Sequence, residues 1–500
     1  MSLTVTPRFS NAQAQETKKI KYDAEEMYVD EHVPRGAKRL LGKVVFIHEG
    51  VIMHCDSADF YDSRNSLEAY NNVHINQGDS IDLYGDYLEY DGNTRLAKVR
   101  YNVKLIQDSA YLVTDSLNYD RIKNMAWYEH YGKMVDSTNT LESINGYYYT
   151  DLKDFYAIDS VVLRNPEYNI FSDTLKYNTN SEIAYFFGPT EIISDSNYIY
   201  CENGWYNTIR DIAEVSENAF LKNSKQILKG DSIYYERHHH GGKGYGEAFS
   251  NVYLTDTVEK VILRSNYAQY FEEPERALLV DSAWATHVYD NDSIFLHADT
   301  LRSIYDTAGD YKILKAYYKA KMFKCDFQGK SDSIVYSFRD SLIQMFHNPV
   351  LWSEENQITA SYIEIHTRDG DIDFTLMKSA SMVVSQEDSL RYNQIRGRDM
   401  TGYFRDQELY KIHVEGNGET VYFAKDDDGL IGVNKATGSN MDILLKDSEV
   451  NEIMLRVAPE GTMNPIDHLP ASELKLQGFR WLDNHRPRKK EDIFIWITNE

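Results

Sequence analysis

Hydrophobic and polar residues alternate with a period of two along most of the chain. Within residues 78–108, Asp86 is followed by an apolar residue two positions later (Leu88) and by a tyrosine four positions later (Tyr90), and a second alternating run follows a turn at 91–93. Side chains two apart lie on the same face of a strand, so Leu88 and Tyr90 share one face. The stretch predicts a strand–turn–strand hairpin with one apolar face.

The same pattern (Asp or Asn, any residue, apolar, any residue, aromatic) returns, in full or in degenerate form, at steps of 28 to 38 residues. Its copies begin at Asp56, Asp86, Asp115, Asn145, Asp173, Asn203, Asp231, Asn266, Asp299, Asp332, Ser361 and Asp399. A period of about 30 residues indicates a repeat architecture. One repeat cannot bury its apolar face alone, but stacked repeats bury a continuous interior. We therefore predict an all-β fold, an elongated stack of antiparallel strand–turn–strand repeats.

The regularity of the pattern divides the chain into four predicted regions. Repeats are clearest in 20–260, they continue in degenerate form in 261–425, and 426–500 combines degenerate repeats with a terminal cap or a partner-binding strand. Residues 1–19 contain Ala12-Gln13-Ala14, the A-x-A pattern that signal peptidase cuts. This region is predicted to be a signal-peptide remnant or a disordered N-terminus.

Composition narrows the class of protein. With 42% hydrophobic and 26% charged residues in 500, the chain has the balance of an ordered soluble protein. Its net charge of −25 argues against nucleic acid as a partner, because phosphate binding needs a basic surface. No apolar run is long enough for a membrane-spanning helix.

No motif forms a convincing catalytic or metal site. The stretch from His48 to His54 resembles HExxH but has the wrong spacing and lies in strands. His238–His240 indicates a solvated loop, and Asp426–Gly429 lacks the spacing of a calcium loop. The repeated Asp is interpreted as capping backbone N–H groups at a corner between sheets, with a ladder of ligands as the alternative. We predict that the protein is not an enzyme and that it binds no cofactor and no metal.

Three cysteines, Cys55, Cys201 and Cys325, lie far apart and form no CxxC motif. Their number neither requires nor excludes a disulfide.

The repeated apolar and aromatic columns are the candidate binding residues. They form either an ordinary sealed core or an apolar trough, open along one side, that holds acyl chains. The trough candidates are Leu88, Tyr90, Leu117, Tyr119, Leu175, Tyr177, Ile233, Tyr235, Ile334, Tyr336, Val73, Ile75, Val103 and Leu105.

The repeat resembles a known family. The stretch "GKVVFIHEGVIMHCDSADFYDSRNSLEAYNNVHI" at 42–76, with its paired A-x-x-N-V half, is similar to the OstA-like repeat of the LptA-like periplasmic lipopolysaccharide-transport family. The resemblance implies a β-jellyroll ("β-taco") of two facing antiparallel sheets, with lipid A acyl chains held inside and sugars outside. It also implies a periplasmic protein without catalysis, either free or associated with the outer membrane.

By the same resemblance, the protein forms part of the bridge that carries lipopolysaccharide from the inner to the outer membrane. Its partners would be lipopolysaccharide and other transport components joined through edge strands, including an outer-membrane translocon, and copies of itself end to end. Two alternatives stay open. One is a structural or adhesive β-solenoid without lipid cargo, which a sealed interior would favour. The other is a polysaccharide-active enzyme on a right-handed β-helix, whose catalytic acids would interrupt the period at one rung.

Overall fold

The computed structural model describes residues 19–29, 32–78, 81–289, 292–306, 311–426, 429–446, 449–466, 469–470 and 472–498. The Ala12-Gln13-Ala14 pattern and part of the acidic turn at 426–429 lie outside the described residues. The chain divides into two compact units, unit 1 (Met1–Val215) and unit 2 (Ser216–Glu500), with β17 (Ile212–Ser216) at the boundary. The four regions predicted from the sequence stay predictions.

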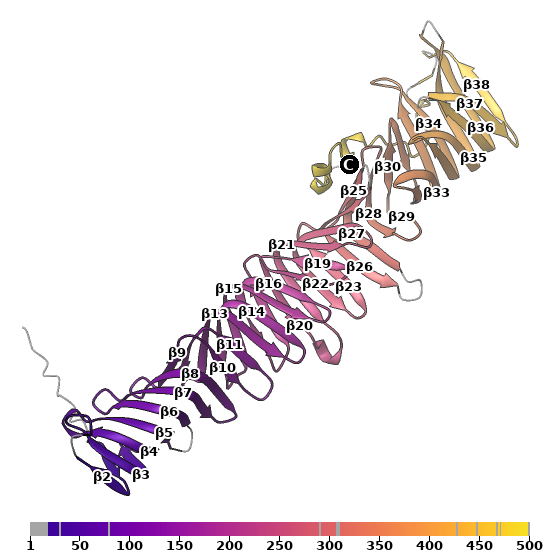
Figure 1. The fold of residues 1–500 in the computed structure, drawn as a ribbon. Coiled ribbons are helices and arrows are strands. Elements are labelled where there is room, and N and C mark those ends of the chain that lie inside the picture. Colours follow the sequence, from indigo (N-terminus) through magenta and orange to yellow (C-terminus); the bar gives the residue numbers. More distant parts are fainter. Residues whose placement is uncertain are drawn as a thin grey trace, which may run out of the picture. The chain divides into compact units, whose positions relative to one another are not determined.

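Unit 1 is built from short hairpin-connected strands (Figure 1). They are β1 (Lys21–Asp23), β2 (Glu26–Tyr28), β3 (Lys38–His48), β4 (Val51–Tyr61), β5 (Ser66–Gln77), β6 (Ile81–Asp91), β7 (Leu96–Gln107), β8 (Ala110–Asp120), β9 (Met125–Tyr128), β10 (Gly132–Val135), β11 (Thr140–Ser143), β12 (Asn145–Tyr149), β13 (Asp154–Asn165), β14 (Tyr168–Asn178), β15 (Ile183–Ser194) and β16 (Tyr198–Asn207), with the 3-10 turn η1 (Asp62–Arg64).

Unit 2 continues the same kind of strand. Its elements are β18 (Phe220–Lys222), β19 (Gln226–Lys229), β20 (Ser232–Glu236), η2 (His239–Gly241), β21 (Tyr245–Asp256), β22 (Val261–Glu272), β23 (Glu275–Val280), β24 (Trp284–Val288), β25 (Ser293–His297), β26 (Thr300–Asp306), β27 (Tyr311–Phe323), β28 (Phe327–Ser337), β29 (Leu342–Phe346), β30 (Val350–Ser353), β31 (Asn356–Thr359), β32 (Tyr362–Arg368), β33 (Asp371–Gln386), β34 (Tyr392–Arg405), β35 (Glu408–Asp426), β36 (Gly429–Lys446), β37 (Glu449–Arg456), β38 (Glu460–Asn464), η4 (Asp483–His485) and η5 (Lys490–Phe494).

Neighbouring strands pair antiparallel. In unit 1, β6 pairs with β5 and β7, and in unit 2, β28 pairs with β27 and β29, all antiparallel. The predicted all-β fold of antiparallel repeats is therefore confirmed. The right-handed β-helix is wrong for these strands, because that scaffold needs parallel pairing. Among the described residues, no helix is long and apolar enough to cross a membrane.

Each long strand bends at a corner in its middle. In β7 the register with β6 shifts between Arg100 and Val103, where Tyr101 and Asn102 have φ of 64° and 52°. Two successive left-handed residues are unusual away from glycine. They turn the strand while Val99 and Val103, on either side, both point into the interior. The corner therefore divides each long strand into two arms with apolar inner faces.

The corner explains the Asn of the A-x-x-N-V half-repeat. Asn102 occupies a left-handed position, and its side-chain amide donates to the carboxylate of Asp86 on the neighbouring strand at 2.6 Å. The same pair forms between Asn72 and Asp56 at 2.8 Å, and between Asn251 and Asp231 at 2.9 Å.

The repeated Asp was interpreted as a backbone cap. A backbone donor is found at Asp399, which accepts from the Ser379 N–H at 3.1 Å. At Asp56, Asp86 and Asp231 the partner is instead an Asn side chain of the next strand. Where the repeat begins with Asn145, the corner residue is Asp159, and the bond is kept with the roles exchanged, at 2.8 Å.

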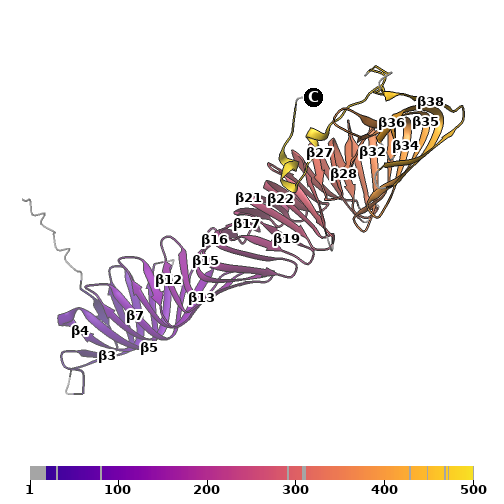
Figure 2. The ribbon, with the colours of Figure 1, turned by 90° about the horizontal axis from the view of Figure 1, so that it is seen from above.

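A C-terminal segment covers the outer face of one sheet of unit 2. We call the described part of residues 469–498 the strap; its helical turns lie beside β27 and β28 in Figure 2. Beneath it, successive residues of β30 such as Leu351 and Trp352 are both buried, so both faces of this sheet are covered. The strap therefore lies along a sheet face, and the terminal cap or partner-binding strand expected for the chain end stays a prediction.

Buried glutamines hold the strap by its backbone. The Gln394 side chain donates to the Leu474 carbonyl and accepts from the Leu476 N–H, both at 2.8 Å. Gln357 makes the same two bonds with Arg480 and Leu482. These side-chain amides satisfy backbone groups of an extended segment in the way a neighbouring strand would. Leucines of the strap also pack on the buried Val421, Phe423 and Val433.

Candidate functional site: the apolar interior and its mouth

The trough candidates of each unit all face the interior. In unit 1, Leu88, Leu117 and Leu175 have no exposed surface, and their partner tyrosines Tyr90 and Tyr119 are 1% exposed. The other candidates of unit 1 are equally buried: Val73, Ile75, Val103, Leu105 and Tyr177.

Unit 2 buries its own candidates in the same way. Ile233 and Ile334 are at most 1% exposed, and Tyr235 and Tyr336 are 6% and 3% exposed. The candidate side chains are therefore packed together inside both units rather than exposed along a groove, and their role in holding lipid stays a prediction.

Some repeats shift their inward face by one position. At Asn145 the inward residues are Gly146 and Tyr148, and Tyr147 is exposed. The tight contact between Gly146 and the Tyr128 ring gives the reason, because a Cβ at Gly146 would lie 2.3 Å from that ring. The sequence pattern alone does not reveal this shift.

Two sheets enclose the interior of each unit. In unit 1, sheet I comprises the arms that carry Leu88 and Tyr90, and sheet II those that carry Leu83 and Leu105. In unit 2, Tyr336 marks sheet I and Phe327 marks sheet II. The corner joins the two sheets along one side. On the other side, each sheet ends in a row of hairpin turns, and we call the gap between these rows the mouth.

Tyrosine hydroxyls cross the mouth of unit 1. Tyr90 lies 2.7 Å from His48 Nδ1, and Tyr119 donates to Gln77 at 3.2 Å. Tyr148 donates to Gln107 at 2.6 Å. In each case the tyrosine is the last inward residue of sheet I, and its partner is the last inward residue of sheet II.

The next rung repeats the arrangement. Tyr177 donates to Asp136 at 2.6 Å and accepts from Asn139 at 3.0 Å. Burial raises the pKa of Tyr148 to about 12 and raises the pKa of Tyr90, although Arg121 opposes the latter. These hydroxyls are therefore protonated donors at neutral pH. The repeated tyrosine has two roles: its ring fills the interior and its hydroxyl closes the mouth.

Ion pairs lie outside these tyrosines. Arg95 of sheet I contacts Glu49 of sheet II at 2.7 Å, and Lys153 contacts Asp108 at 2.6 Å. The Lys153 pair is largely solvent-exposed and adds little stability. Side chains make these bonds across the mouth, and Gln107 also donates to the backbone carbonyl of Thr150 at 3.1 Å.

Unit 2 uses buried charge at one point of its mouth. Lys312 of sheet I reaches Asp256 of sheet II and also contacts Glu275 at 2.6 Å. Gln226 of sheet II donates to Glu275 at 2.7 Å. The side chain of Lys312 is only 11% exposed. Burial opposes its charge, but the two carboxylates prevail and raise the pKa of Lys312.

A second cluster closes the mouth farther along unit 2. The Tyr336 hydroxyl lies 2.8 Å from His287 Nδ1 and 2.5 Å from the Tyr289 hydroxyl. Burial lowers the pKa of His287 to about 4, so its ring is neutral at pH 7. The nearby Lys324 crosses the mouth to Asp371 at 3.0 Å and contacts Asp326 at 2.6 Å.

A cavity of about 770 Å³ lies in this part of the mouth. Turns of both sheets line it, and its walls are mostly polar. Its lining residues are Val258, Glu259, Lys260, His287, Val288, Tyr289, Asp292, Lys324, Cys325, Ser341, Asp369, Asp371 and Gln407. Sequence reasoning missed this site because its residues come from turns up to about 150 positions apart and share no motif.

The cysteines are unpaired thiols. Cys55 and Cys201 are buried, and Cys325 is exposed. Burial raises the pKa of Cys55 and of Cys201 to about 12, so neither is a ready thiolate.

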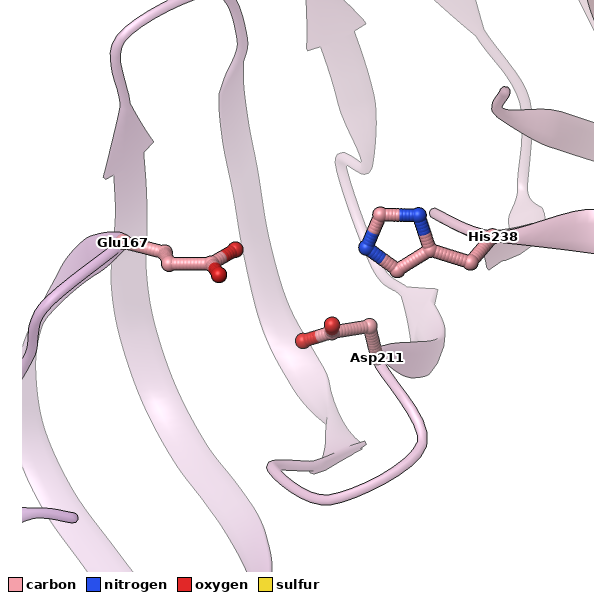
Figure 3. A group of neighbouring side chains, drawn as sticks. All are labelled: Glu167, Asp211 and His238. Carbon is pink, nitrogen blue, oxygen red and sulfur yellow. The ribbon is translucent and has the colours of Figure 1, made fainter. Parts of the chain in front are cut away.

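Figure 3 draws three turn residues, of which two belong to unit 1 and one, His238, belongs to unit 2. Glu167 and Asp211 lie in turns of unit 1 (Figure 3). Asp211 accepts a hydrogen bond from the Tyr206 hydroxyl at 2.7 Å. In unit 2, His238 precedes η2, where His239 contacts Glu236 and stacks on Tyr245. His239 is thus packed against the sheet, whereas a solvated loop was expected.

Two family models match parts of the chain. Residues 16–173 match the model described as OstA-like protein, and residues 289–371 match the model described as LptA/(LptD N-terminal domain) LPS transport protein. A search of curated protein sequences found no significant match.

A solved structure is also similar. It is LptH, described as the LptA homologous periplasmic component of the conserved lipopolysaccharide transport device from Pseudomonas aeruginosa. The two chains share 16% sequence identity over 21% of this chain and 81% of LptH, with a TM-score of 0.20.

Proposed function

Since the chain carries an OstA-like domain and a domain of the LptA/LptD N-terminal lipopolysaccharide transport family, we propose that it is a periplasmic lipopolysaccharide carrier. In this role it forms part of the bridge between the inner and outer membranes. It contacts other transport components, including an outer-membrane translocon, through its edge strands. It does this work without catalysis.

The observation that carries the proposal is the construction of the interior. Apolar residues of sheets I and II face each other across the interior of each unit, and hydrogen bonds of side chains such as Tyr119 and Tyr148 close the mouth of unit 1. Opening one rung of unit 1 exchanges a few hydrogen bonds for bonds to water, and each such bond contributes roughly 1 kcal/mol. Acyl chains that enter would replace contacts among Leu88, Tyr90 and their neighbours with equally apolar contacts.

A second candidate is a structural or adhesive β-solenoid that holds no lipid. The close packing of the interior favours it, since the trough candidates are at most 6% exposed. The two functions differ in one respect: a carrier opens its mouth and takes up lipid, and a solenoid does not.

The test is lipid loading of the purified full-length chain. Mass spectrometry of protein expressed in a Gram-negative host should find lipid A bound near stoichiometry, and this lipid should exchange with added lipopolysaccharide. The variants Leu88→Asp and Ile233→Asp should block loading, whereas Tyr84→Asp, on the outer face of β6, should not. Folded protein that stays lipid-free and ignores added lipopolysaccharide would leave the structural solenoid as the function.

A further inference from the structure

The mouth cavity of unit 2 lies above the apolar interior and faces solvent. His287 and Tyr289 are among its lining residues, and their ring centroids are 4.4 Å apart. Tyr336, at the last inward position of sheet I, bonds both of them. Asp369 and Gln407 at the rim are exposed. Its volume is within the range of small-molecule sites, which run from roughly 300 to 1,000 Å³.

The charged residues that line the cavity argue against a phosphate ligand. Four carboxylates (Glu259, Asp292, Asp369 and Asp371) face two lysines, Lys260 and Lys324. Lys324 is already engaged with Asp326 and Asp371 and lies 3.6 Å from Asp292. The lining therefore offers no surplus of positive charge for a phosphate.

The same lysine argues against a metal ion. Asp292, Cys325 and Asp326 lie close enough together to hold one. However, the ammonium group of Lys324 contacts two of these three groups and supplies the positive charge that a cation would bring.

The remaining features suit a sugar. Aromatic rings offer an apolar face for the C–H groups of a pyranose, and carboxylates and amides accept hydrogen bonds from its hydroxyls. His287 and Tyr289 supply the rings, and Asp369, Asp371 and Gln407 supply the polar groups. Surplus negative charge further favours a sugar that carries an amino group.

We propose that this cavity binds the carbohydrate part of the glycolipid cargo, through sugar units that are neutral or carry amino groups rather than phosphates. The proposal rests on the carrier function given above and adds to it a fixed site for the polar end of the cargo. A free oligosaccharide of the same chemistry would satisfy the same groups, so the test separates the two sources.

Calorimetric titration of the full-length protein tests the site with three probes: a glucosamine tetrasaccharide, maltotetraose and glucose 1-phosphate. The glucosamine tetrasaccharide should bind most tightly, maltotetraose more weakly, and glucose 1-phosphate not measurably. Lipopolysaccharide should displace the tetrasaccharide. Tight binding of the phosphate sugar, or failure of lipopolysaccharide to compete, would overturn the proposal.

Matched variants locate the binding. Val258 lies in a turn that lines the cavity, and its N–H donates to Asp256; Ile209 holds the same position in a turn of unit 1, where its N–H donates to Asn207. Both side chains are exposed, so V258W fills the rim of the cavity and I209W tests the substitution itself. V258W should weaken tetrasaccharide binding at least tenfold, and I209W should leave it unchanged.

A second pair tests the charge. Asp369 and Asp406 lie in neighbouring turns and both have positive φ, a conformation that Asn also tolerates, but only Asp369 lines the cavity. D369N should weaken glucosamine binding more than D406N does.

If V258W and D369N both bind the sugar like the unchanged protein, the site is wrong. If no free sugar binds while lipid still loads, the cavity proposal falls and the carrier function stands. If sugar binds but lipid never loads, the carrier function falls, and with it the assignment of the sugar to a lipid cargo.

Discussion

Unit 1 and unit 2 bury the same kind of interior but close it with different chemistry. The mouth of unit 1 is crossed on successive rungs by tyrosine hydroxyls bonded to polar side chains, as at Tyr119 and Tyr148, and ion pairs such as Arg95–Glu49 lie outside them. The mouth of unit 2 contains the buried ion pairs of Lys312, a neutral histidine and a cavity, and its sheet is braced from outside by the strap. The repeat thus fixes the interior, while the side chains that close the mouth differ between the two units.

Removal of the strap should give the largest effect and should be confined to unit 2. Truncation after residue 468 uncovers Val421 and Phe423 and leaves the side chains of Gln357 and Gln394 without their backbone partners. The lost burial and hydrogen bonds amount to about 5 kcal/mol or more. Hydrogen exchange should accelerate in β30 and β31 and stay unchanged in unit 1. Equal acceleration in both units would contradict the independence of the two.

The substitution K312M should be the next most damaging change. It leaves Asp256 and Glu275 in a mostly buried site without their cation, and breaking such a pair costs about 3–5 kcal/mol. The matched change in unit 1, K153M, removes an exposed pair and should cost at most about 1 kcal/mol. Denaturant unfolding of the two variants measures the difference; similar losses would show that the two mouths do not differ in this way.

Mild acid should weaken the mouth of unit 2 through His287. Its pKa is about 4 in the folded protein, against an ordinary value of 6.5. A base with a lowered folded pKa contributes stability that is complete above pH 6.5 and is lost as the pH falls toward 4. The difference between these two pKa values corresponds to about 3 kcal/mol in the free energy of unfolding. Burial against Tyr289, Tyr336 and Phe338, with Lys260 nearby, causes the shift.

Hydrogen exchange between pH 7 and pH 4.5, corrected for its intrinsic pH dependence, should therefore show opening near β24 and β28 of unit 2. The bonds of Tyr119 and Tyr148 in unit 1 do not titrate in this range. The variant H287F should abolish the effect. If hydrogen exchange in H287F still depends on pH, titratable groups other than His287 cause the opening.

Removal of single tyrosine hydroxyls should give the smallest effect on stability. Y148F leaves the buried acceptor of Gln107 without this donor and should cost about 1 kcal/mol. Y147F, on the outer face of the same strand, should be neutral. If the hydroxyls hold the mouth closed, Y148F should also load lipid faster than Y147F. Equal loading rates would show that these hydrogen bonds do not control lipid entry.

Much of the fold follows from the sequence because the period-two pattern recurs about every 30 residues. The period-two pattern placed Leu88, Tyr90, Leu117 and Tyr119 on the inner face, where they are buried. The corner was less accessible: the Asn of A-x-x-N-V was visible as a motif, but its left-handed conformation and its bond to the Asp of the neighbouring repeat appear only when strands are paired.

The site was the hardest part to predict. The tyrosine of one rung bonds a polar residue about 42 positions away, on the other sheet. The pattern within one repeat therefore cannot predict this contact. The strap binds residues of unit 2 more than 100 positions earlier through generic amide chemistry, as at Gln357. The cavity depends on turn residues, which lie outside the repeated pattern of Asp, apolar and aromatic positions.

Photocrosslinking of lipid inside the trough tests the central claim most directly. Benzoylphenylalanine is placed at Tyr90, which points into the interior, or at Tyr84, which is on the same strand but 38% exposed on its outer face. After incubation with lipopolysaccharide and irradiation, the account predicts a lipid-A-containing adduct at position 90 and none at position 84. An adduct at neither position, or equal adducts at both, in protein that remains folded would contradict the claim that this interior opens to hold acyl chains.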